Sequence, residues 1–178
     1  MRTIEELNAY LKALSLVNSN YKGDFWYCFE IHEIEKHGDF IESLTQYEIN
    51  SDDYDGYVKG EYELVSLPRG LDQLAPKLNE LFSDYLFWAV ESVKLDSDVE
   101  RVEAMRNSLN GSIRDNLLSE VFIDSLKDLV GSDAQVFSIG IKEQENPTCW
   151  SVLDVTWGDV YLVWGSKAAY ILEVSGSD

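Results

Sequence analysis

The chain has 178 residues, of which 45% are hydrophobic and 12% aromatic, and its 33 Asp and Glu against 14 Lys and Arg give a formal net charge of -19. This apolar content is enough for a buried core and excludes an acidic disordered chain, and the length fits one domain over residues 1–178. The acid excess also argues against direct contact with nucleic acid, because binding to a phosphate backbone needs a basic surface.

The lack of a recognisable targeting signal and the small number of cysteines favour a cytoplasmic protein. No apolar run approaches the ~18–20 residues of a membrane-spanning helix, so we expect no membrane contact. The first six residues, MRTIEE, are acidic where a signal peptide is basic and then apolar. Cys28 and Cys149 are too few for a secreted disulfide framework, and we expect both as reduced thiols.

The N-terminal third predicts one helix followed by strands. Thr3 and Glu6 have the spacing of a capping box, and an apolar stripe follows, so a helix is expected over residues 4–15. An aromatic-rich alternation then predicts a strand over 25–35. Further strands are expected over 40–49 and 57–67, the second of them with one solvated face.

The middle of the chain predicts helices and its end a sheet. Helices are expected over 71–93, with Pro76 in the first turn, over 98–108, and over 112–130, where Gly131 ends the helix. Strands are expected over 135–142, 150–157, 160–164 and 168–174, with a two-residue hairpin loop at Gly158-Asp159. The fold class is therefore α+β: a mainly antiparallel sheet, made of N-terminal strands and a C-terminal meander, packed against central helices.

Motifs for metal, cofactor or catalysis are weak. Asp53 and Asp55 precede Gly56 as in a calcium loop, but Tyr62 stands where that loop needs a bidentate Glu, and an exposed acidic turn is the simpler explanation. Cys28, Glu30 and His32 share one strand parity, but they lack the paired spacing of a zinc site. Glycine-rich phosphate loops and the Gly-x-Ser-x-Gly element are absent from the sequence, so no cofactor, metal or catalytic residue is predicted.

The acid is concentrated between residues 24 and 63, which hold twelve carboxylates and only two lysines. Such a concentration steers association with a basic partner. We therefore expect a binding protein, not an enzyme, that neutralises a basic protein such as a nuclease-like toxin, as immunity proteins do. The carboxylates predicted to form the binding face are Glu30, Glu33, Glu35, Asp52, Asp53, Asp55, Glu61 and Glu63.

Two other functions stay open at this level. A nucleic-acid mimic would carry its carboxylates as a regular ridge and block a DNA-binding protein. A small enzyme would instead hold at least two converging carboxylates in a deep pocket.

Overall fold

The computed structural model describes residues 3–19, 26–50, 62–83, 117–141 and 157–177. These residues form helices and one five-stranded sheet, which gives the α+β class predicted from the sequence. The elements are α1 (Ile4–Asn18), β1 (Trp26–Ile34), α2 (Phe40–Asn50), β2 (Tyr62–Ser66), α3 (Leu71–Ser83), α6 (Leu117–Val130), β3 (Gln135–Ile141), β4 (Trp157–Trp164) and β5 (Ala169–Ser177). None of the helices described is long and apolar enough to cross a membrane.

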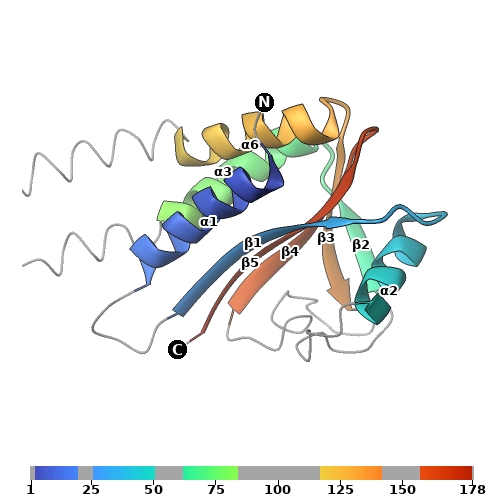
Figure 1. Cartoon of the computed structure of the whole chain (residues 1–178), viewed down its shortest axis with the longest axis horizontal. Coiled ribbons are helices and arrows are strands. Elements are labelled where there is room, and N and C mark those ends of the chain that lie inside the picture. Colours follow the sequence, from blue (N-terminus) through green and yellow to red (C-terminus); the bar gives the residue numbers. More distant parts are fainter. Residues whose placement is uncertain (1–2, 20–25, 51–61, 84–116, 142–156, 178) are drawn as a thin grey trace, which may run out of the picture.

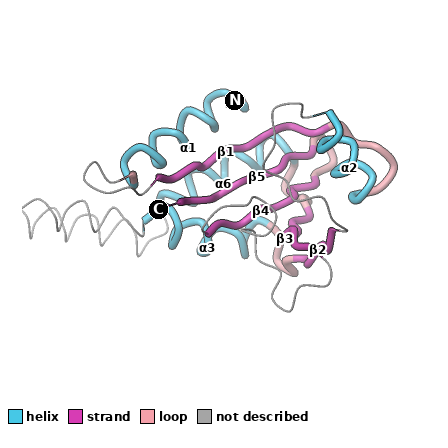
Figure 2. The backbone as a smooth tube through the Cα atoms, turned by 90° about the horizontal axis from the view of Figure 1, so that it is seen from below, coloured by secondary structure: helices cyan, strands magenta, loops and turns pink. Residues whose placement is uncertain are grey.

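The sheet has the strand order β1-β5-β4-β3-β2, and every neighbouring pair is antiparallel (Figure 2). Strands β3, β4 and β5 form an antiparallel C-terminal meander, in which the strand predicted over 160–164 is part of the longer β4. The two N-terminal strands add to its opposite sides, so that β1 and β2 are the two edges of the sheet.

Helices cover the two faces of the sheet unequally (Figure 1). Helices α1, α3 and α6 lie on one side, which we call the three-helix face, and side chains such as Phe29, Tyr161 and Leu172 point into the larger core there. Helix α2 lies on the other side, the α2 face, over a smaller core that includes Leu162 and Ile171. The alternation of the strands therefore separates two apolar layers.

Helix α1 confirms the expected capping box and continues past the predicted end. The Thr3 amide donates to Glu6 Oε2 over 3.0 Å, and the Glu6 amide donates to Thr3 Oγ1 over 3.3 Å. Gly131 likewise ends α6 as expected: it has a positive φ of 100°, and its amide donates to the Lys127 carbonyl.

The strand predicted over 40–49 is wrong, because these residues form helix α2. Asp39 Oδ1 accepts from the Glu42 amide over 2.9 Å and so caps the first turn. Phe40, Leu44 and Tyr47, at helical spacing, then pack on the α2 face. The apolar residues follow the period of a helix, and the strand prediction missed it.

The hairpin predicted at Gly158-Asp159 is also wrong. Both residues lie inside β4, where they pair with Ser175 and Val174 of β5. The chain instead turns after β4, where the Gly165 amide donates to the Ala168 carbonyl over 3.0 Å.

Pro76 lies inside α3 and not in its first turn, since the helix already begins at Leu71. The helix accommodates it at the cost of one backbone hydrogen bond.

Of the strand predicted over 57–67, residues 62–66 form β2. Several predicted segments lie outside the described residues. They are the helix predicted over 98–108, most of the strand predicted over 150–157, and residues 57–61, 84–93 and 112–116 of other predicted elements.

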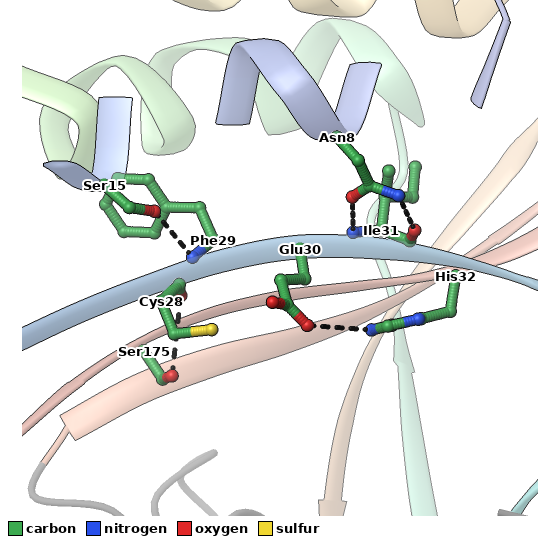
Figure 3. A network of polar contacts seen from close by, with 8 residues as sticks. All are labelled: Asn8, Ser15, Cys28, Phe29, Glu30, Ile31, His32 and Ser175. Atoms are coloured by element: carbon green, nitrogen blue, oxygen red, sulfur yellow. Dashed lines mark hydrogen bonds and ion pairs between the residues drawn. The ribbon is translucent and has the colours of Figure 1, made fainter. Parts of the chain in front are cut away.

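Side chains of α1 close the outer edge of β1 (Figure 3). Asn8 both donates to the Ile31 carbonyl, over 2.8 Å, and accepts from the Ile31 amide, over 2.9 Å. The Phe29 amide donates to Ser15 Oγ over 2.9 Å, and the Tyr27 amide donates to Ser19 Oγ over 3.4 Å. Between Tyr27 and Ile31, α1 and its C-cap residue Ser19 therefore occupy backbone groups that an edge strand would offer to another chain.

Candidate functional site

The predicted acidic binding face is split among the described residues. Glu30 and Glu33 lie on β1 and Glu35 just after it, whereas Glu63 lies on β2 at the opposite edge of the sheet. Four strand spacings of about 4.8 Å put these edges roughly 19 Å apart. The predicted residues Asp52, Asp53, Asp55 and Glu61 lie outside the described residues.

Glu30 and Glu63 also lie on opposite faces. Glu63 lies on the same face of β2 as Val65. Val65 pairs with Ser138, and Ser138 pairs with Tyr161, which belongs to the three-helix core, so Glu63 lies on the three-helix face. Glu30 has the parity of Ile34 and lies on the α2 face. The described carboxylates therefore do not form one continuous row.

A pocket with charged residues of both signs lies where β1 ends and β5 begins. It has a volume of about 410 Å³ and is lined by residues 33–36 and 167–169. Glu33 and Glu35, both exposed, contribute carboxylates, and Ile34, Ala168 and Ala169 contribute apolar surface. Among the described residues, this pocket brings together two of the predicted binding carboxylates.

The two lysines of the pocket direct their ammonium groups onto the chain itself. Lys36 Nζ donates to the Gly165 carbonyl and lies 4.8 Å from the centre of the Trp164 ring, a cation–π arrangement. Lys167 Nζ donates to the Asp128 carbonyl, over 3.0 Å, in the last turn of α6. Each charge is thus held by a carbonyl, and by a ring in the first case, and neither lysine belongs to an ion pair among the described residues.

A second polar group lies on the α2 face of β1 and β5 (Figure 3). Glu30 pairs across the strands with Glu173, which is only 3% exposed. His32 Nε2 lies 3.3 Å from Glu30 Oε2. Glu173 is the residue that sequence reasoning missed, and its only local signal is a carboxylate in the otherwise apolar stretch Ile171–Val174.

These carboxylates raise the pKa of their neighbours. Burial, then the charge and hydrogen bond of Glu30, and then the charge of Glu173 raise the pKa of the Cys28 thiol to about 12. Burial, followed by the charges of Glu173 and Glu30, raises the pKa of Tyr47 above its ordinary value. The group therefore keeps its thiol and its phenol protonated, which is unlike the activation of a nucleophile.

We expect the Cys28 thiol to react slowly with alkylating reagents. In a Cys149→Ser background at pH 8, its carboxymethylation by iodoacetate is expected to be at least ~100-fold slower than that of the unfolded chain, because the thiolate is the reactive form. Glu30→Gln should speed the reaction several-fold, and Glu63→Gln, at the other edge of the sheet, serves as the matched control. A Cys28 that reacts as fast folded as unfolded would contradict this assignment.

The same shift has a consequence for stability at high pH. The pKa of the Cys28 thiol is higher in the folded chain than its ordinary value of 9.0, so folding favours the protonated form. The stability that this contributes is complete below pH 9 and is lost as the pH rises towards 12.

A metal site finds no support among the described residues. No three His, Cys, Asp or Glu side chains come together there closely enough to hold a metal ion. The group on the α2 face has Cys28, Glu30 and His32 on one parity, as the sequence indicates. The acidic turn that resembles a calcium loop lies outside the described residues.

Comparison with protein-family models, with curated proteins and with solved structures found no match for this chain.

Proposed function

We propose that this chain binds and neutralises a basic protein partner, as immunity-type inhibitors do with nuclease-like toxins. The observation that carries the proposal is the net charge of -19, together with the exposed carboxylates of Glu33 and Glu35 beside lysines whose ammonium groups are engaged by the chain itself. Such a surface attracts a positively charged groove and competes with the phosphates that the groove would otherwise bind.

The charge predicts how association should depend on salt. Exposed charges are screened beyond about 10 Å at 0.1 M salt. We therefore expect the association rate with a captured partner to fall at least ~10-fold between 50 and 500 mM NaCl, as measured by surface plasmon resonance. The partner is obtained by affinity capture on the immobilised chain from its native host at low salt and identified by mass spectrometry.

Reversing the predicted carboxylates Asp52, Asp53 and Asp55 to lysine should slow association further. A matched variant reverses three exposed carboxylates of α6, Glu120, Asp124 and Asp128, and so changes the net charge equally. A local binding face predicts that the first variant loses more of the association rate than the second. Capture of only neutral or acidic partners would overturn the proposal.

A further inference from the structure

The pocket at the end of β1 has the chemistry of a binding site for one basic side chain. Its apolar surface, from Ile34, Ala168 and Ala169, suits the methylene stem of an arginine or lysine. The Glu33 carboxylate suits the charged head. The Glu35 carboxylate can add to it, because Glu35 is 86% exposed, although its Oε2 also lies 3.3 Å from His37 Nε2. An arginine can bind carboxylates through paired hydrogen bonds, which also fixes its orientation.

The two lysines of this pocket direct their ammonium groups away from Glu33. Lys36 Nζ lies against Trp164 on the α2 face. Glu33 lies on the three-helix face of β1, where it pairs with Tyr170 of the larger core. The nearby charge of Glu33, second to burial, raises the pKa of the Tyr170 hydroxyl, so that group stays neutral. The Glu33 carboxylate therefore belongs to no ion pair among the described residues, whereas Glu35 Oε2 lies 3.3 Å from His37 Nε2.

The backbone beside the pocket is the part of the β1 edge that α1 does not close. Asn8, Ser15 and Ser19 bond to the outward backbone groups of β1 as far as Ile31. The next outward residue is Glu33, and no described side chain bonds to its backbone. An extended segment can pair with such an open strand end.

Acid from α1 adds to the same end of the sheet. The bonds from Ser19 to Tyr27 and from Asn8 to Ile31 show that α1 runs antiparallel to β1. The first turn of α1, which carries Glu5 and Glu6, therefore lies towards the Glu33 end of the strand. Charge complementarity thus selects a basic occupant for this surface.

We propose that an extended basic segment of the protein partner docks on the open end of β1 and places an arginine or lysine side chain in the pocket between Glu33, Glu35 and Ala168. The inference rests on the proposed function, because it names the place where the basic partner is bound.

The test uses a blocked pentapeptide, acetyl-Thr-Val-Arg-Val-Thr-amide, titrated into the full-length 15N-labelled chain and followed by NMR. We expect amide shifts to concentrate at residues 33–36 and 167–169. The Glu33→Gln/Glu35→Gln variant is expected to bind about tenfold more weakly, and a peptide with citrulline in place of arginine should lose affinity similarly. The Glu120→Gln/Asp124→Asn variant, with the same change in net charge on α6, should bind within about twofold of the parent chain.

Several outcomes would contradict the proposed binding site for a basic side chain. They are shifts centred on other residues, equal binding of the citrulline peptide, or unchanged affinity of the Glu33→Gln/Glu35→Gln variant with a native spectrum. The experiment also separates this inference from the proposed function. If that variant still captures the basic partner with unchanged affinity, the proposed function stands and the proposed binding site is wrong. If the peptide binds the pocket but no basic partner is captured, the proposed function is wrong.

Discussion

Replacing Leu11 by alanine is expected to lower the free energy of unfolding by about 2–5 kcal/mol. Leu11 is 0% exposed and packs in the core between α1 and the three-helix face of the sheet. Its replacement removes apolar burial and leaves a cavity that the surrounding helices fill only in part. Urea unfolding followed by tryptophan fluorescence measures the change.

Leu16 provides a matched control in the same helix. It is 63% exposed, so Leu16→Ala makes the same chemical change in α1 without opening a cavity. We expect it to alter the unfolding free energy by no more than about 0.5 kcal/mol. Equal losses from the two replacements would show that α1 does not pack on the sheet as described.

Local signals in the sequence were sufficient for some elements. The capping box at Thr3 and the stripe that follows it predict α1, since both depend only on residues a few positions apart. The same holds for the end of α6 at Gly131, which needs a positive φ. Helix α2 was missed because a short segment with several apolar residues fits a strand as well as a helix, although Asp39 supplies a cap.

The arrangement of the acidic residues could not be predicted, because it depends on long-range strand pairing. Glu30 and Glu63 belong to one acidic stretch of sequence, but β1 pairs with β5 and β2 pairs with β3, which places them at opposite edges. The same pairing brings Glu173 beside Glu30 from a distant part of the chain. Counting charge along the sequence therefore gave a sign for the partner but not a single face.

The second large effect on the free energy of unfolding is expected from Ser15, which bonds to the edge of β1. Ser15 is buried, and its hydroxyl accepts from the Phe29 amide while donating to the Leu11 carbonyl over 3.1 Å. Ser15→Ala removes the acceptor and leaves a buried amide without its partner. We expect a loss of about 1–3 kcal/mol in the free energy of unfolding, and faster hydrogen exchange at the Phe29 amide in particular.

Ser132→Ala is the matched control, because Ser132 is exposed in the turn before β3 and its replacement should change neither quantity by a measurable amount. A role of Ser15 in helix packing alone would lower stability while leaving the exchange of the Phe29 amide in step with its neighbours. A local opening at Phe29 instead means that α1 closes the strand edge through these hydroxyl and amide groups. Adding Asn8→Ala should then extend the opening to Ile31 and promote self-association, detectable by light scattering, since an unprotected edge pairs with a second copy.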